Sequence, residues 1–354
     1  MSSANESDLH LQLSDFQIVP LAIWTTTVTV LGLLGNALVI YSSIRYNAIQ
    51  MDKISLLLVQ NLAVADFIYI LSNILPSAVS YIARKYILGT VYCFISAQTS
   101  FIYAQVNTVT VLAITAYRRW ILRSPLRPVT HGGAKVGVGV IWITACATTV
   151  ICLAYKSTSI FSQKSAKCYS SIYTNKNKTA SILFRLTFGG AVFLPVVIIG
   201  IINVILFIIS YKSSKKLRAA QGLSTSKELN SARALTTVCA LSCAFTASWL
   251  PYLIFMIWKG FDAELPDEVE QVGVSCIMIN SFCNPILYTM TNRRFGGFVW
   301  SMLTSVATST FSFNSHSTQN QAGNDFPNTH STQSQPGPLH ESHTNAVIIA
   351  NYTL

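Results

Sequence analysis

Long apolar runs alternate with short polar connections along most of this chain. A helix needs about 20 mostly apolar residues to cross a hydrocarbon layer of roughly 30 Å. Seven runs reach that length, at residues 18–44, 54–81, 90–117, 136–155, 181–211, 234–258 and 269–290. The pattern therefore predicts an all-α membrane protein built as a seven-transmembrane helix bundle.

The charges in the connections predict the orientation of this bundle. Lys and Arg gather in the first, third and fifth connections, where Asp52 and Glu228 are the only carboxylates. The remaining connections carry a more even balance of both signs. Because Lys and Arg accumulate on the cytoplasmic side, we expect a multi-pass plasma-membrane protein with its N-terminus outside and its C-terminus in the cytoplasm. The glycosylation sequons at Asn5 and Asn177 then both lie outside.

Composition narrows the class further. Hydrophobic residues make up 51% of the chain and charged residues only 10%, which is unlike a soluble globular protein. The net charge of +11 follows from the cytoplasmic connections, so we expect no nucleic-acid partner. The sequence holds no Gly-rich phosphate loop, no Cys/His metal spacing and no nucleophile constellation, so we expect no enzyme.

The segments outside the spans have their own compositions. Residues 1–17 are expected to form an extracellular segment without a cleavable signal peptide, so that the first span acts as its own anchor. Residues 18–303 form the helical domain, which ends in a short amphipathic eighth helix around Phe295–Leu303. Residues 304–354 are rich in Ser, Thr, Asn and Gln and predict a disordered cytoplasmic tail.

Polar residues inside the spans point to function, because they are costly in a membrane. Asp66 is the only carboxylate in the predicted core of any span. It is either a structural hydrogen-bonding residue or a site for a cation or proton. Amide and hydroxyl residues of other spans could meet it: Asn36, Asn107, Asn280, Ser281 and Asn284. Pro195, Pro251 and Pro285 interrupt further spans and free backbone carbonyls there.

The order and spacing of these landmarks resemble one family, the rhodopsin-like (class A) G-protein-coupled receptors, over about residues 18–303. The matching residues are Gly35-Asn36, Leu62 to Asp66, Cys93, Arg118 before Pro125-Leu126, Trp142, Pro195, Phe245, Ser248 to Tyr252, and Asn284 to Tyr288. The tryptophan-proline and Asn-Pro-x-x-Tyr motifs are the most specific of them. The N-terminus and the tail match nothing.

This resemblance implies roles for individual residues. Cys93 and Cys168 would form a disulfide between the third span and the second extracellular loop. Asp66, Asn107, Asn280 and Ser281 would form the family's sodium pocket, with Na⁺ as an allosteric ion. The activation switch would comprise Tyr117, Arg118, Asn203, Phe245, Trp249, Asn284, Pro285 and Tyr288.

Departures from the family pattern concern activation. The family's Asp/Glu-Arg-Tyr triplet is here Tyr117-Arg118-Arg119, so that Arg118 has no neighbouring acid in the sequence. Ser231 replaces the acid that often completes this lock, and Asn203 replaces a tyrosine of the fifth span. We expect either measurable basal signalling or altered coupling, and a non-signalling receptor stays open as an alternative.

The residues that would line the ligand pocket in the family exclude some ligands. They are Ser100, Phe101, Ala104, Gln105, Arg185, Thr187, Trp249, Tyr252, Leu253, Met256, Val274 and Met278. Met278 replaces the retinal-binding lysine, which excludes an opsin, and Ser100 replaces the aspartate of amine receptors.

Charges of both signs around the extracellular entrance favour a peptide ligand. Lipids or other small hydrophobic ligands also fit the apolar floor, and a seven-span transporter with Asp66 as its ion site is a further alternative.

Partners follow from the same resemblance. A heterotrimeric G protein would bind the cytoplasmic end. The hydroxyl-rich tail would be phosphorylated by receptor kinases and then bind arrestin. The terminal Tyr352-Thr353-Leu354 is compatible with strand addition to a PDZ domain.

Overall fold

The computed structural model describes residues 10–45, 52–123, 129–154, 159–163, 165–170, 182, 186, 189–219, 239–255, 267–291, 295–302 and 304–305. The chain divides into two compact units, Met1–Ser301 and Met302–Leu354. The transmembrane helices all belong to the first unit, and only this unit is described below.

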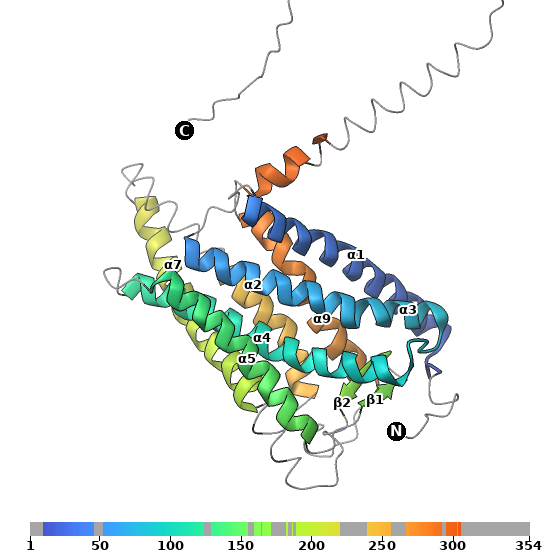
Figure 1. Ribbon diagram of the computed structural model, residues 1–354. Coiled ribbons are helices and arrows are strands. Elements are labelled where there is room, and N and C mark those ends of the chain that lie inside the picture. The colour runs from blue at the N-terminus through green and yellow to red at the C-terminus, as the bar shows by residue number, and fades with distance from the viewer. Residues whose placement is uncertain are drawn as a thin grey trace, which may run out of the picture. The chain divides into compact units, whose positions relative to one another are not determined.

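Each predicted apolar run coincides with a described helix (Figure 1). The helices are α1 (Asp15–Arg45), α2 (Lys53–Tyr69), α3 (Leu75–Ala83), α4 (Gly89–Arg123), α5 (His131–Ala154), α7 (Leu194–Ala219), the helix Cys239–Phe255, and α9 (Asp267–Thr291). Two π-helical turns extend them, η2 (Ile70–Ile74) between α2 and α3, and η4 (Gly189–Phe193) before α7. Six of these spans are long and apolar enough to cross a membrane, and the described part of the sixth predicted run, Cys239–Phe255, is shorter.

The second span contains a feature that the apolar pattern did not reveal. It runs without a break from Lys53 to Ala83, but the π turn η2 lies in its middle and Pro76 follows in the first turn of α3. A π turn adds one residue to the helix, and such turns are frequent at functional sites. The polar residue Asn73 lies in this turn.

A two-stranded hairpin lies at the end of the bundle where α1 begins (Figure 1). Strands β1 (Ser159–Ser162) and β2 (Lys167–Ser170) are antiparallel, with Ser162 opposite Lys167. Ala166 precedes β2 with a positive φ of 49°, which makes the reversal between the strands tight. The sequence analysis expected no strand here, because each strand is only four residues long.

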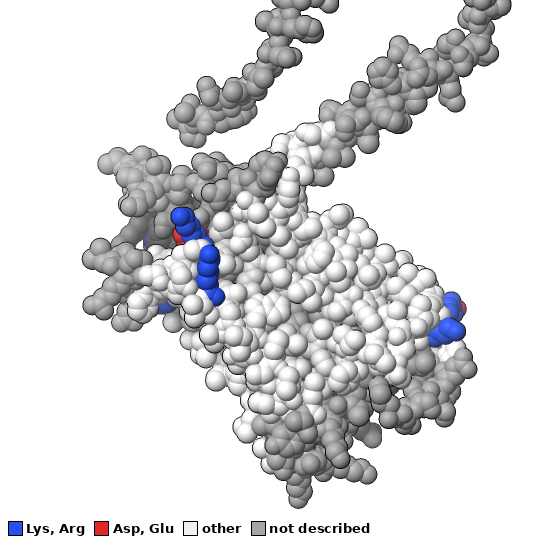
Figure 2. Space-filling model, in the orientation of Figure 1, with Lys and Arg blue, Asp and Glu red and all other residues white. Residues whose placement is uncertain are grey.

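The surface of the bundle matches a membrane environment. Charged side chains gather at the two ends of the visible face, and the band between them carries none (Figure 2). Large apolar side chains such as Ile143 and Phe207 point outward, whereas Phe245, Trp249 and Tyr288 are fully buried. Apolar groups can face lipid without cost, so the interior is left for polar and aromatic contacts.

Two glycines allow close backbone packing. A Cβ on Gly35 would lie 2.8 Å from Pro285 Cβ, so α1 can approach α9 closely only because this residue is glycine. A Cβ on Gly296 would lie 2.6 Å from the carbonyl oxygen of Thr289. Residues 295–302 are helical, as the amphipathic pattern predicted, and Phe295 is fully buried.

Candidate functional site

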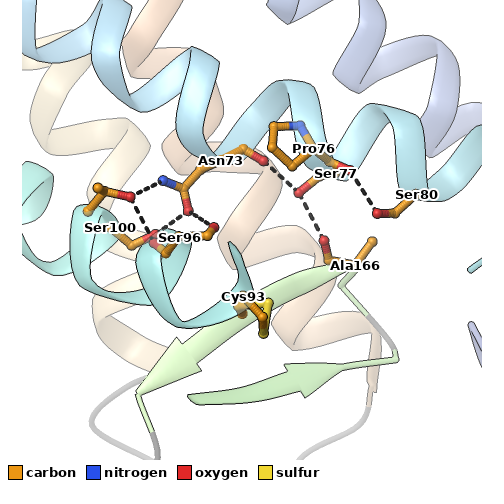
Figure 3. The surroundings of a disulfide bond; sticks show 10 residues. Asn73, Pro76, Ser77, Ser80, Cys93, Ser96, Ser100 and Ala166 are labelled. Atoms are coloured by element: carbon orange, nitrogen blue, oxygen red, sulfur yellow. Dashed lines mark hydrogen bonds between the residues drawn. A yellow bond between two sulfur atoms is a disulfide. The ribbon is translucent and has the colours of Figure 1, made fainter. Parts of the chain in front are cut away.

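A disulfide fixes the hairpin β1–β2 to the bundle. Cys93, in the first turns of α4, is bonded to Cys168 of β2 with an S–S distance of 2.07 Å. The pairing that the family resemblance implied is therefore confirmed. The Ser77 hydroxyl of α3 donates to the Ala166 carbonyl oxygen at 3.0 Å, so the hairpin is held from two helices at once (Figure 3).

Asn73 organises a polar cluster beneath this hairpin. Its Oδ1 accepts hydrogen bonds from Ser100 Oγ at 2.6 Å and Ser96 Oγ at 2.8 Å, and its Nδ2 donates to Thr99 Oγ1 at 3.0 Å (Figure 3). Ser100, which we expected to line the ligand pocket, donates to Asn73 of η2. The sequence analysis missed Asn73, although an amide in an apolar run was a signal for it.

The predicted pocket residues are brought together only in part. Seven of them pack in one buried cluster: Phe101, Ala104, Trp249, Tyr252, Leu253, Val274 and Met278. Gln105 is buried, and its Oε1 accepts a hydrogen bond from Thr148 Oγ1 of α5 at 2.8 Å. Arg185, Thr187 and Met256 lie outside the described residues.

Asp66 is fully buried in the middle of the bundle and accepts three hydrogen bonds. Tyr103 Oη donates to Oδ1 at 2.9 Å, Asn107 Nδ2 donates to Oδ1 at 3.2 Å, and Asn284 Nδ2 donates to Oδ2 at 2.7 Å. These donors come from α4 and α9, so one carboxylate joins three helices. Asn36 of α1 joins the same region, since its Nδ2 donates to the Ser281 carbonyl oxygen at 2.7 Å.

Tyr103 lies at the centre of this network. Its hydroxyl accepts from Asn107 Nδ2 at 3.1 Å and Asn280 Nδ2 at 3.2 Å, and it is 3.1 Å from Ser281 Oγ. The sequence analysis missed Tyr103, because a tyrosine in an apolar run is indistinguishable from an ordinary core residue.

Arg118, in the last turns of α4, has a carboxylate partner. Its NH2 group lies 3.2 Å from Asp52 Oδ2, and the Arg118 side chain is only 13% exposed. Asp52 caps α2, where its Oδ1 accepts the Ser55 N–H at 3.0 Å. The side chain of Tyr117 also hydrogen-bonds to Asp52. One acidic residue therefore contacts both of the first two residues of the Tyr117-Arg118-Arg119 triplet.

The remaining switch residues connect the later helices. Ser242 Oγ donates to Asn203 Oδ1 at 2.5 Å and so joins the helix Cys239–Phe255 to α7. The rings of Phe245 and Trp249 are 5.6 Å apart between centroids. Tyr288 is buried, and its hydroxyl has no hydrogen-bond partner among the described residues. Ser231 lies outside the described residues.

Comparison with known proteins identifies the family. The model of the 7 transmembrane receptor (rhodopsin family) matches residues 35–288. This chain belongs to the rhodopsin family of seven-transmembrane receptors. Squid rhodopsin has a similar fold, with a TM-score of 0.69, 19% sequence identity, and coverage of 84% of this chain and 88% of that one. The predicted fold class, an all-α seven-helix membrane protein, is thereby confirmed, and the chain is not an enzyme.

The relatives within the family include a rhodopsin and receptors that are named after different ligands. The chain is 23% identical to a Gq-coupled rhodopsin of Mizuhopecten yessoensis over 82% of its own length and 62% of that protein. It is 26% identical to somatostatin receptor type 4 of Rattus norvegicus, over 76% of this chain and 68% of the relative. It is also 26% identical to the type-1 angiotensin II receptor of Canis lupus familiaris, over 75% of both chains.

The sodium pocket implied by the family does not fit this rhodopsin-family chain. A hard cation needs several oxygen ligands facing it. Here N–H and O–H groups point at both carboxylate oxygens of Asp66. The other three expected ligands, Asn107, Asn280 and Ser281, all contact the Tyr103 hydroxyl, which therefore lies where they converge.

We therefore expect the purified receptor to unfold at the same temperature in NaCl and in KCl of equal ionic strength. Replacing Tyr103 with serine removes the ring and should create a sodium-specific rise in the unfolding temperature, which Asp66→Asn should abolish. Thermal unfolding in both salts measures this. A sodium-specific stabilisation of the unmodified chain would contradict the interpretation.

The structure also corrects the expectation about Arg118. We had expected no acid to hold this residue, because neither sequence neighbour is acidic. Asp52 supplies the missing carboxylate from the start of α2, 66 positions earlier in the chain (118 − 52). The premise for raised basal signalling in this rhodopsin-family receptor is therefore removed.

Proposed function

We propose that this chain is a plasma-membrane receptor that binds an extracellular peptide and activates heterotrimeric G proteins in response. The observation that carries the proposal is that one helix bundle has buried polar contacts in its middle and fixed contacts at both of its ends. A disulfide-anchored hairpin covers the extracellular end, the Asp66 network joins three helices in the middle, and Arg118 with its ion-pair partner lies at the cytoplasmic end. These are the parts that a receptor needs to pass a ligand signal across a membrane.

Two observations support a peptide over other ligands. The extracellular end presents both signs of charge, since Arg84 pairs with Asp15 and both side chains are largely exposed. A peptide has termini and side chains that can use several such groups. Somatostatin and angiotensin II, which name two of the relatives, are peptides. Met278 at the position of the retinal lysine opposes an opsin function, and Ser100 at the amine-binding position opposes an amine ligand.

The cytoplasmic partners belong to the same proposal. A G protein would contact the end of the bundle near Arg118. Receptor kinases and arrestin would act on the Ser- and Thr-rich tail, and a PDZ domain would bind its last residues. Residues 304–305 at the start of the tail are helical, and the rest of the tail and the sequons at Asn5 and Asn177 lie outside the described residues.

A nucleotide-exchange screen tests the function. Membranes that contain the receptor are mixed with a panel of purified G proteins and with peptide pools, and guanine-nucleotide exchange is measured. We expect at least one pool to stimulate exchange, and Arg118→Ala at equal surface expression to lose the response. Stimulation by lipid pools alone would replace the peptide by a lipid ligand, and no stimulation by any pool would count against the proposed function.

A further inference from the structure

Lys167 is a buried lysine in the extracellular hairpin whose position is tightly determined. It is the first residue of β2, it pairs with Ser162 of β1, and it precedes the disulfide-bonded Cys168. Its preceding residue, Ala166, is hydrogen-bonded to Ser77 of α3. The residue is only 7% exposed, so the side chain points into the bundle and not toward water.

The ammonium group of Lys167 lies against an aromatic pair. Its Nζ donates to the Tyr69 hydroxyl at 2.6 Å and lies 5.1 Å from the centroid of the Tyr69 ring. Tyr69 in turn stacks on Tyr103, with 3.9 Å between ring centroids and 6° between ring planes. The lysine therefore reaches from the loop to the layer directly above the Asp66 network, where α2 and α4 face each other.

This ammonium has no anionic partner among the described residues, whose ion pairs are Arg84–Asp15 and Arg118–Asp52. Glu270, a buried carboxylate at the same end, instead accepts hydrogen bonds from Ser162 Oγ and Ser165 Oγ, both at 2.8 Å. Burial lowers the pKa of Lys167 to about 7, because a charge without a partner is costly in an apolar surrounding.

An ammonium group has three N–H donors, and within the described residues Lys167 uses only one of them, toward Tyr69. The described residues accept no hydrogen bond from the other two donors, so these donors are open to an acceptor from outside this part of the chain. An anion would satisfy both the charge and the donors. A carboxylate fits best, because it offers two oxygens that can accept both remaining N–H groups.

We propose that Lys167 is the anchoring residue for a carboxylate group of the ligand. This inference rests on the proposed receptor function and adds the chemical class of one ligand group. The carboxylate could belong to the C-terminus of a peptide or to a fatty acid, since both present the same two oxygens. Tyr69 positions the ammonium through its hydroxyl and its ring. The disulfide and the Ser77 hydrogen bond keep the loop in the place from which the lysine reaches inward.

The test is a binding measurement on the purified full-length receptor that needs no G protein. Thermal unfolding is followed with N-acetyl-L-phenylalanine and with its amide, and separately with octanoate and octanamide. A ligand that binds only the folded state raises the unfolding temperature according to its concentration and affinity. We expect one of the two acids to bind about tenfold more tightly than its amide, because a charged hydrogen bond is lost in the amide. The pair that shows this preference identifies the source of the carboxylate.

Three variants locate the effect. Lys167→Met should lose the preference for the acid, and Lys167→Arg should keep it. Lys85→Met, which removes an exposed lysine at the same end of the bundle, should also keep it. Equal binding of acids and amides, or no binding of either acid, would overturn the proposal in the unmodified receptor, even if Lys167→Met does not fold. Acid preference that persists in Lys167→Met would overturn it as well. Failure of the exchange screen would leave this binding result unaffected, so the two hypotheses can fail separately.

Discussion

Replacing Asp52 with asparagine is expected to raise basal nucleotide exchange roughly fivefold at equal surface expression. The ion pair between Asp52 and Arg118 exists in this conformation, and its loss favours any state in which Arg118 turns away. Arg118 is 13% exposed but Asp52 is 37% exposed, so solvent screens the pair and about 1 kcal/mol is a reasonable value.

Asparagine is chosen because it separates two roles of Asp52. The residue also caps α2 through the Ser55 N–H, and asparagine caps a helix about as well as aspartate. Asp52→Asn thus removes the charge and keeps the cap, whereas Asp52→Ala removes both. If Asp52→Ala lowers stability but Asp52→Asn leaves basal exchange unchanged, Asp52 acts only as a cap.

A second substitution tests whether the charge itself matters. Tyr117→Asp in the Asp52→Asn background returns an acid beside Arg118, at the place where the family has one. We expect it to lower basal exchange toward that of the unmodified receptor. If basal exchange stays high in this double variant, a carboxylate beside Arg118 is not enough to hold the receptor in its inactive state.

Asp52 is ionised under the conditions of this experiment. Burial by itself would raise the pKa of the Asp52 carboxyl. The hydrogen bond from the Ser55 N–H and the charge of Arg118 lower the pKa, and together these effects outweigh burial, so the pKa is lowered. A carboxyl with a lowered pKa contributes stability above its usual pKa and loses it as the pH falls through the lowered value. The ion pair is therefore fully present at cytoplasmic pH.

The second large effect is expected from the disulfide. Cys93→Ser or Cys168→Ser should destabilise the receptor by about 4 kcal/mol, because the bond closes a loop with a sequence separation of 75 residues. The variants should also release the hairpin that carries Lys167. Surface expression and thermal unfolding measure the loss.

A matched set of variants checks that the loss comes from one shared bond. The double variant Cys93→Ser/Cys168→Ser should be no worse than either single one, since the first change already breaks the bond. Cys146→Ser, which removes a free and exposed cysteine of α5, should have little effect. Additive losses from the two single changes would argue against a shared disulfide.

The sequence by itself determined the spans and the family, and it predicts their orientation in the membrane. The spans can be predicted from the sequence because a helix needs about 20 consecutive apolar residues to cross the membrane, whatever it packs against. The family can be predicted because motifs such as Asn284-Pro285-Ile286-Leu287-Tyr288 are runs of consecutive residues that can be identified without the structure. The Cys93–Cys168 pairing was implied by the family resemblance, and the structure contains it.

Tertiary structure decided the partners of the buried polar groups. Asp52 was one of two acids in the cytoplasmic connections, but only the packing of α2 beside α4 brings it to Arg118. Tyr103 and Lys167 looked like a core aromatic and a loop charge. Their roles depend on the direction of a side chain, which apolar periodicity does not specify. An unpaired polar group is costly in the low-dielectric interior, so each of these contacts matters for stability. The atoms that pair belong to helices far apart in the chain, and only the tertiary structure brings them together.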